Sequence, residues 1–210
     1  MNQNPQKINY FLECEKEIRR NAGRLPRLLL HACCAPCSSS VLEYLSPHFD
    51  ITLFYYNPNI TPEKEYRKRV AELHRLVAQA AYSNPVRIVE GRYDSGEFFS
   101  AARGLENLPE GGERCAKCYR LRLEETAKAA AEGGYAYFTT TLSVSPYKNA
   151  QKLNAIGAVL GGQYGVKYLL SDFKKKDGYR RSIELSAQYG LYRQNYCGCI
   201  FSKRLREEKV

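Results

Sequence analysis

Seven of the eight cysteines lie in three short clusters, and clustered thiols commonly bind metal or carry redox chemistry. The clusters are Cys33, Cys34 and Cys37; Cys115 and Cys118; and Cys197 and Cys199. A secreted protein would use such cysteines for disulfides, but the first 27 residues of this 210-residue chain are polar and charged. No apolar run is long enough to cross a bilayer. We therefore expect a soluble, cytoplasmic protein with no membrane partner, whose thiols bind a metal centre or do redox chemistry.

The first two clusters together offer four thiolates. Cys33 and Cys34 are adjacent, so their side chains converge only if the preceding strand ends there. Cys115 and Cys118 are three residues apart, which places both sulfurs on one side of a first helical turn. Helix N-termini favour thiolate over thiol. Four thiolates fit either a [4Fe–4S] cluster or structural zinc, and the adjacent pair at the edge of a sheet favours the cluster.

The third cluster, Cys197-Gly-Cys199, leaves several interpretations open. One intervening glycine allows a tight, strained disulfide that is easily reduced. The two thiols could instead be further metal ligands, or simply buried side chains near the end of the chain. Cys14, alone on a predicted helix, is expected to be an inert core residue.

Strands alternate with helices almost throughout the chain, which predicts an α/β fold with a parallel sheet covered by helices on both faces. Strands are expected at residues 27–33, 51–57, 86–90, 135–141 and 167–171. Helices are expected at residues 8–20, from 36 onward, 62–80, 95–104, 115–131, 149–159 and around 182–189. Ligands of such sheets bind beyond the carboxyl ends of the strands, so the turn at residues 31–37 is the expected site of chemistry.

We expect a single domain over residues 1–210. Within it, residues 1–24 would form an N-terminal helical extension, residues 25–172 the α/β core, and residues 173–210 a basic C-terminal tail that carries the third cysteine cluster.

The basic and tyrosine-rich composition suggests a nucleic-acid partner. The net charge is +10, and 17 tyrosines can both stack on bases and form hydrogen bonds. A basic run after the fifth strand supplies the candidate contacts Lys174, Lys175, Lys176, Tyr179, Arg180 and Arg181. Tyr147, Tyr179 and Tyr196 lie in predicted loops and are the best candidates for base stacking. The charges of the helix at 62–80, Arg69 among them, are expected to be a solvated face, and His31 to be a satisfied core residue.

Neither GxxxxGK[ST] nor GxGxxG follows the first strand, and the Ser-Gly-Gly-x-Asp-Ser signature of ATP pyrophosphatases is also missing. These absences argue against nucleotide-dependent chemistry of those types.

Five segments of the chain resemble the epoxyqueuosine reductases of the QueH type. They read LLLHACCAPCSS (28–39), YYNPNITPEKEYRKR (55–69), RCAKCYRLRLEETA (114–127), TTLSVSPYKN (140–149) and KKKDGYRRSIELSAQYGLYRQNYCGCIFS (174–202). The segments occur in order and span nearly the whole chain, which makes them far more specific than any single CxxC.

The resemblance implies a Rossmann-like (HUP-like) fold related to the adenine-nucleotide hydrolases. It also implies reduction of epoxyqueuosine at the tRNA wobble position to queuosine and water, with tRNA and a low-potential electron donor as partners. By position, Cys33, Cys34, Cys115 and Cys118 resemble the ligands of a [4Fe–4S] cluster, and Cys197 and Cys199 a redox-active pair. An additional iron is implied too, for which Cys37 is a candidate ligand, and Lys148 in the fourth segment is a further candidate for substrate binding.

Two other functions remain open at this point. One is tRNA thiolation, in which some enzymes also combine a cluster with a Rossmann-like fold, and the other is a non-enzymatic, zinc-bound nucleic-acid module.

Overall fold

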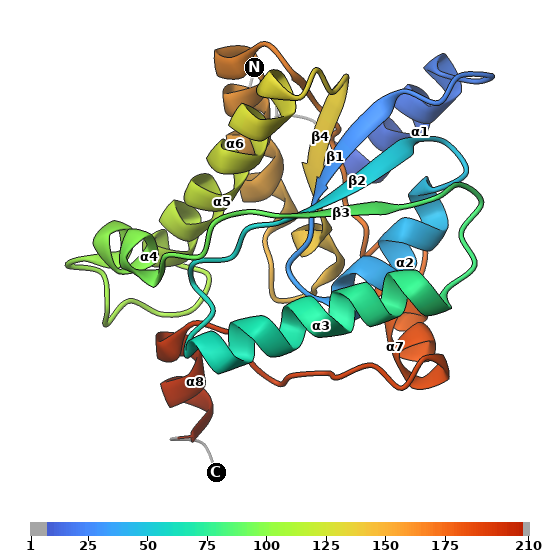
Figure 1. Ribbon diagram of the computed structural model, residues 1–210. Helices are drawn as coiled ribbons and strands as arrows, with labels where there is room; N and C mark the ends of the chain where they lie inside the picture. The colour runs from blue at the N-terminus through green and yellow to red at the C-terminus, as the bar shows by residue number, and fades with distance from the viewer. Residues whose placement is uncertain (1–7, 208–210) are drawn as a thin grey trace, which may run out of the picture.

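The computed structural model describes residues 8–207, which form an α/β fold around a five-stranded sheet (Figure 1). All strand pairs are parallel, and the order across the sheet is β3-β2-β1-β4-β5. The strands are β1 (Arg27–His31), β2 (Asp50–Tyr55), β3 (Arg87–Glu90), β4 (Tyr137–Thr140) and β5 (Lys167–Tyr168). The predicted parallel α/β sheet is therefore confirmed. The outermost parts of the two predicted terminal segments, residues 1–7 and 208–210, lie outside the described residues.

The helices follow the predicted alternation closely. They are α1 (Tyr10–Arg20), α2 (Ala35–Leu45), α3 (Glu63–Gln79), α4 (Ser95–Ala102), α5 (Glu113–Glu132), α6 (Ala150–Tyr164), α7 (Gly178–Gln188) and α8 (Ile200–Glu207), with a 3₁₀ turn at Thr141–Val144. Several elements differ from expectation. The helices α5 and α7 begin before residues 115 and 182, α6 runs past residue 159, and the cysteine-bearing tail contains the helix α8. The strand β5 ends at Tyr168 rather than at residue 171.

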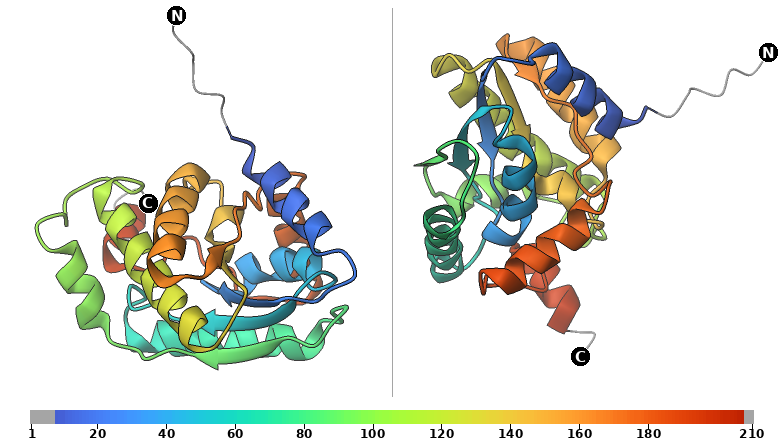
Figure 2. Two further views of the ribbon diagram at one scale, coloured as in Figure 1. Left: turned by 90° about the horizontal axis from the view of Figure 1, so that it is seen from above. Right: turned by 90° about the vertical axis from the view of Figure 1, so that its right-hand side faces the viewer.

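Successive residues of β1 face two different cores, because side chains alternate across a strand. Leu28 and Leu30 pack with α2 and α3, whereas Leu29 packs with α5 and α6. Both faces of the sheet are thus covered by helices (Figure 2), and the strands are apolar on both sides, as buried parallel strands are. The strand order reverses between β1 and β4, which makes the carboxyl ends of these two strands the switch point of the sheet.

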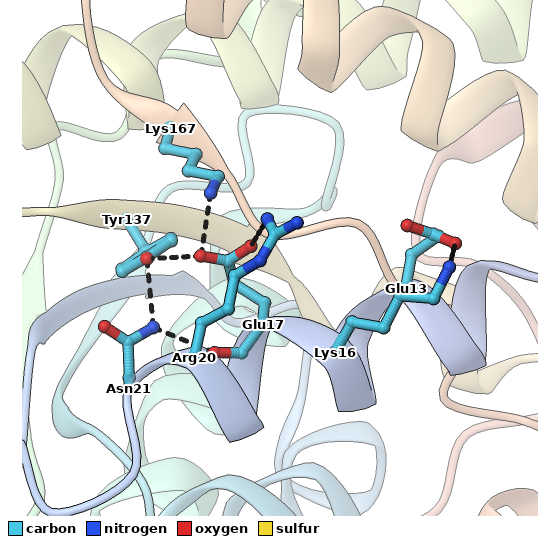
Figure 3. A network of polar contacts seen from close by, with 7 residues as sticks. All are labelled: Glu13, Lys16, Glu17, Arg20, Asn21, Tyr137 and Lys167. Atoms are coloured by element: carbon cyan, nitrogen blue, oxygen red, sulfur yellow. Dashed lines mark hydrogen bonds and ion pairs between the residues drawn. The ribbon is translucent and has the colours of Figure 1, made fainter.

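The helix α1 is held at the opposite, amino end of the sheet by a buried carboxylate (Figure 3). Glu17 is 9% exposed and accepts hydrogen bonds from the hydroxyl of Tyr137 and from Nζ of Lys167, both at 2.7 Å. Arg20 lies 3.2 Å from the other carboxylate oxygen, and Asn21 donates to the Tyr137 hydroxyl at 3.0 Å. Tyr137 and Lys167 are the first residues of β4 and β5, so this network fixes α1 to the start of two strands.

A strap of irregular chain, residues 189–199, connects α7 to α8 and runs along α3 (Figure 1). Arg75 of α3 donates to the carbonyl of Tyr189 at 2.8 Å, and Arg69 donates to the carbonyl of Cys197 at 3.3 Å. The strap therefore carries the last two cysteines to the start of α3, next to the carboxyl end of the sheet. No helix among residues 8–207 is long and apolar enough to span a membrane.

Candidate functional site

The first cysteine cluster forms where β1 stops and α2 begins. β1 ends at His31, Cys34 is the N-cap of α2, and Pro36 occupies the first helical turn, where a missing N–H costs nothing. The chain turns within these residues, so Cys33 and Cys34 do not point to opposite faces. Their sulfurs lie 3.8 Å apart, and the sulfurs of Cys33, Cys34 and Cys37 all lie within 4.8 Å of one another.

The three thiols of the first cluster differ in pKa. A hydrogen bond from Cys33, and a second from Cys37, hold the pKa of Cys34 well below its usual value despite burial. The bond to Cys34 raises the pKa of Cys33 to about 11, and the pKa of Cys37 also rises because it donates to both neighbours. Of the three thiols, Cys34 is therefore the most readily deprotonated, which agrees with its place at the helix N-terminus, whereas Cys37 does not follow that expectation.

His31 is a satisfied core residue, as expected. It is fully buried, its Nδ1 lies 2.8 Å from the Thr140 hydroxyl, and its Nε2 lies 3.1 Å from the carbonyl of Tyr56. Because a carbonyl only accepts, Nε2 carries the proton and Nδ1 accepts from Thr140. Burial lowers the pKa of His31 to about 4, which keeps the ring neutral.

The other two cysteine clusters meet at a neighbouring cavity of about 10 Å³. Its lining includes all four of their thiols, Cys115, Cys118, Cys197 and Cys199. Cys115 and Cys118 lie in the first two turns of α5, and Cys118 packs with Phe98 and Ala102 of α4 and with Cys199. Burial raises the pKa of Cys118, and it raises the pKa of Cys199 to about 12.

The glycine between the last two cysteines is required by its conformation. Gly198 has φ of +112°, a region that L side chains rarely adopt, and a Cβ there would lie 2.9 Å from Ile60 and 3.0 Å from Arg69. Its carbonyl accepts from the N–H of Thr61 at 3.1 Å. Cys197 and Cys199 are both free thiols, as are all the cysteines of this structure.

A much larger cavity, of about 450 Å³, opens beside the first cluster. Cys33, Cys34 and Cys37 line it on one side, and Cys197 on another. Cys197 also lines the small cavity, as do Glu110 and Arg122, so the two cavities adjoin. The first cluster and the Cys115–Cys118 pair therefore line adjoining cavities, but among the described residues only the first cluster brings three ligand sulfurs within 4.8 Å of one another.

Buried arginines surround both cavities. Arg69 and Arg122 are 2% and 1% exposed, and each has one terminal nitrogen without a hydrogen-bond partner among the described residues. Burial lowers the pKa of Arg122, but the nearby thiols of Cys118 and Cys197 outweigh this effect. The pKa therefore lies above its usual value, and the guanidinium stays charged. These cations favour a negatively charged ligand between the cysteine clusters.

The carboxylate of Glu110 lines both cavities and connects the third cysteine cluster to Lys148 through hydrogen bonds. It pairs with Nζ of Lys148 at 2.9 Å and accepts from the Ser202 hydroxyl at 3.2 Å. Ser202 in turn accepts from the N–H of Cys197 at 3.1 Å, and its own N–H donates to the sulfur of Cys199 at 3.4 Å. Lys148, a predicted substrate contact, is thus 93% buried but reaches the wall of the large cavity.

The basic run predicted to contact nucleic acid divides into paired and unpaired residues. Arg181 of α7 pairs with Glu43 of α2 at 2.8 Å, Arg180 with Glu184, and Lys174 with Asp172. Within residues 8–207, Lys175 and Lys176 form no ion pair, and both are exposed. Tyr179 lines the large cavity, together with the other two tyrosines singled out for stacking, Tyr147 and Tyr196.

Sequence reasoning missed Arg69, Arg122 and Glu110. Assigning Arg69 to a solvated face was wrong, because it lies three residues after Tyr66 and one before Val70 on the apolar face of α3. The spacing also indicates that Arg122 lies beside the cysteines, since it follows Cys118 by four residues and Cys115 by seven on one helix face. Glu110 lies in a loop and gave no periodic signal.

The residues present fit an anionic metal–sulfur group. Soft thiolates are the ligands that iron–sulfur clusters use, and seven thiols lie around two adjoining cavities. The charged guanidinium groups of Arg69 and Arg122 supply positive charge beside them. Cys14 lies apart on α1, 1% exposed in the core, and lines neither cavity, which confirms it as a core residue.

Comparison with known proteins agrees with this chemistry. The family model of epoxyqueuosine reductase QueH matches residues 28–205. A protein of that name from Streptococcus pyogenes is 42% identical over 210 residues, covering 98% of this chain and 82% of its own length. Its namesake from Staphylococcus epidermidis is 44% identical, covering 94% of this chain and 85% of that protein. A third, from Thermotoga maritima, is 37% identical, covering 87% of this chain and 93% of that protein. The chain belongs to the QueH family of epoxyqueuosine reductases, which are oxidoreductases of queuosine biosynthesis.

Proposed function

We propose that this chain reduces epoxyqueuosine to queuosine at the wobble position of tRNA, in the cytoplasm. The reaction breaks both C–O bonds of the epoxide, forms a C=C bond, and consumes two electrons and two protons to release the oxygen as water. The observation that carries the proposal is the pair of adjoining cavities, one lined with thiols and one large enough for a nucleoside, at the switch point of a sheet in a chain of this family.

We assign a [4Fe–4S] cluster to Cys33, Cys34, Cys115 and Cys118, and Cys37 is the candidate ligand of one additional iron. When bound, the cluster would supply electrons one at a time, taken from a low-potential donor. The mutual approach of Cys33, Cys34 and Cys37 within 4.8 Å supports a metal at the first cluster. The position of Cys115 and Cys118 on the first turns of α5, in the adjoining cavity, supports their joining it.

The large cavity would hold the modified nucleoside. Tyr147, Tyr179 and Tyr196 offer aromatic faces along its wall, and bases of single-stranded RNA stack on such faces. The ammonium of Lys148 reaches the same wall, where nearby thiols and Glu110 keep its pKa above the usual value although burial lowers it. A retained positive charge there would bind the developing oxyanion and hold a proton near it. Outside the cavity, Lys175 and Lys176 would contact phosphates of the same tRNA.

Cys197 and Cys199 would serve as a reversible dithiol. Oxidation of the two thiols to a disulfide releases two electrons and two protons, the number that one epoxide requires. Cys197 lines both cavities, which supports a role of this pair next to the proposed cluster and the nucleoside.

The test is an anaerobic assay with tRNA that lacks only the last step to queuosine. Reconstituted protein and a chemical reductant should convert epoxyqueuosine to queuosine without ATP, as detected by mass spectrometry of nucleosides. Failure of the reconstituted protein to produce queuosine would refute the proposal. A dependence on ATP with sulfur transfer would indicate tRNA thiolation, and a colourless protein with stoichiometric zinc a non-enzymatic module.

A further inference from the structure

The small cavity that the last four cysteines share is also lined by buried polar groups without partners. Within residues 8–207, four of its lining residues have side-chain atoms that are buried and make no hydrogen bond: Asn59, Arg114, Tyr119 and Arg122. Burying such atoms without a partner costs free energy, so proteins rarely gather them in one place. Their gathering beside four thiols indicates that they bond to something held by those thiols.

Asn59 is the clearest case, because its neighbour Asn57 offers a direct comparison. Both side chains are essentially fully buried, at 1% and 0% exposed, in the same turn after β2. The amide of Asn57 is satisfied on both sides: it donates to the carbonyl of Ala32 at 2.8 Å and accepts from Arg122 at 3.3 Å. Neither the nitrogen nor the oxygen of the Asn59 amide has a partner among the described residues. The turn therefore has the geometry to satisfy an asparagine, and the one left without partners is Asn59, which lines the small cavity.

Tyr119 and Arg122 present donors from the same side of α5 that carries Cys115 and Cys118. Tyr119 is 2% exposed and lines the small cavity together with Cys115 and Cys197. The phenol thus lies near sulfurs of two clusters. Arg122 uses Nε for the carbonyl of Cys118 and one terminal nitrogen for Asn57, and its other terminal nitrogen has no partner.

The small cavity around these donors is too small to hold the substrate. At about 10 Å³ it admits no nucleoside, whereas the neighbouring cavity of about 450 Å³ does. The unpartnered atoms around the small cavity therefore face the thiols rather than the substrate.

We propose that Asn59, Tyr119 and Arg122 donate hydrogen bonds to the sulfur atoms of the metal–sulfur centre and thereby raise its reduction potential. The inference rests on the proposed function, because it needs a thiolate-bound centre. Hydrogen bonds to sulfur stabilise the more negative, reduced state more than the oxidised state. The three residues act through the centre and are positioning residues rather than catalytic ones.

The experiment compares Tyr119→Phe with Tyr66→Phe. Tyr66 is a matched control, since it is fully buried on a helix with an unpartnered hydroxyl but lines neither cavity. Both changes remove one oxygen and no hydrogen bond within the protein, so both variants should fold. After anaerobic reconstitution we expect Tyr119→Phe to lower the midpoint potential. The expected shift is about a tenfold change in the ratio of reduced to oxidised centre, or ~59 mV for a one-electron couple. Tyr66→Phe should match the wild type.

A second pair tests the amide. Asn59→Leu should leave the melting temperature of the metal-free protein unchanged or higher, because it removes two unsatisfied polar atoms, and should lower the potential of the loaded protein. Asn154→Leu should lower the melting temperature instead, since Asn154 is equally buried and bonds to Ala150 and Ser171.

The outcomes distinguish a failure of the proposed cofactor from a failure of the hydrogen-bond inference alone. A wild-type protein that binds no iron and sulfide would remove the proposed cofactor and this inference with it. A wild-type centre whose iron content and potential are unchanged in both Tyr119→Phe and Asn59→Leu would overturn the inference alone. Loss of iron in these two variants but not in Tyr66→Phe would support it, because the donors then hold the centre in place.

Discussion

Buried polar side chains at the two ends of the sheet differ in whether the protein supplies all of their hydrogen-bond partners. At the amino end, the carboxylate of Glu17 is met by Tyr137, Lys167 and Arg20, so its charge is compensated within the protein (Figure 3). At the carboxyl end, neither amide atom of the buried Asn59 has a partner among the described residues, and Arg69 pairs with Glu65 at 2.7 Å but keeps one terminal nitrogen without a partner. Burial of a polar residue is therefore no mark of a site. Buried atoms without partners also occur away from the site, as at the Tyr66 hydroxyl, so it is their gathering around the small cavity, beside the thiols, that indicates a ligand.

This contrast predicts that substitutions at the two ends affect different properties. Changes at the carboxyl end should remove activity and leave the metal-free fold intact. Changes at the amino end should weaken the fold and leave the chemistry intact.

The largest effect is expected for Cys34→Ser. Loss of this thiolate should reduce epoxyqueuosine turnover at least about 100-fold, because a cluster ligand is removed. The metal-free variant should melt no lower than the wild type, since Cys34 is an N-cap without a capping hydrogen bond and serine caps helices well. The measurements are turnover of reconstituted protein and thermal unfolding of metal-free protein. A variant that retains full turnover, or one that unfolds in the metal-free state, would break the contrast.

Glu17→Gln should lower the free energy of unfolding by about 2 kcal/mol at neutral pH, because hydrogen bonds to a charged group are lost. Urea unfolding measures this change. Turnover per folded molecule should be unaltered, since Glu17 lies at the opposite end of the sheet from the cysteines. A drop in turnover without a drop in stability would show that the two ends are coupled.

The stability difference between the wild type and Glu17→Gln should also depend on pH. Burial opposes ionisation of Glu17, but hydrogen bonds from Lys167 and Tyr137 outweigh it and lower its pKa below the usual 4.5. A lowered folded-state pKa contributes stability above the unfolded value and loses it as pH falls through the folded value. The stability difference between wild type and Glu17→Gln should therefore be constant from pH 5 to 8 and shrink below about pH 4.5. A difference that persists unchanged at acid pH would exclude the ionised carboxylate as its source.

The smallest effect is expected on the exposed surface of the basic run. Changing Lys175 to Gln and Lys176 to Asn together should weaken tRNA binding and reduce the slope of log affinity against log salt by about 1.4, since each charge contributes about 0.7 on single-stranded RNA. Arg180→Gln is the control, because Arg180 already has carboxylate partners in Asp177 and Glu184. An unchanged slope in the double variant would remove these lysines from the interface.

Much of the fold followed from sequence patterns, because apolar strands and amphipathic helices are local signals. The adjacent cysteines and Pro36 predicted that β1 ends at about Cys33, and the structure ends it two residues earlier, at His31. The helix α8 was missed because its start is set by Cys199 and Ser202 against Glu110, a contact between distant segments. The single-domain division at residues 24 and 172 stays a prediction.

The candidate site was predictable in its cysteines and less so in its surroundings. Spacing alone singled out the three cysteine clusters. Their relative placement depends on the strap along α3 and on the Arg122–Asn57 bond, which no local pattern encodes. The unpartnered donors around the small cavity become visible only when the partners of every buried atom are known.

The central claim is that thiols from two distant segments hold one iron–sulfur cluster, and iron and sulfide content tests it most directly. Cys118→Ser and Cys14→Ser form a matched pair, because both thiols are buried helical side chains with a raised pKa. After anaerobic reconstitution, the Cys14 variant should keep the wild-type iron and sulfide per chain, and the Cys118 variant should lose the four-iron cluster. Equal iron and sulfide in the two variants would contradict the account.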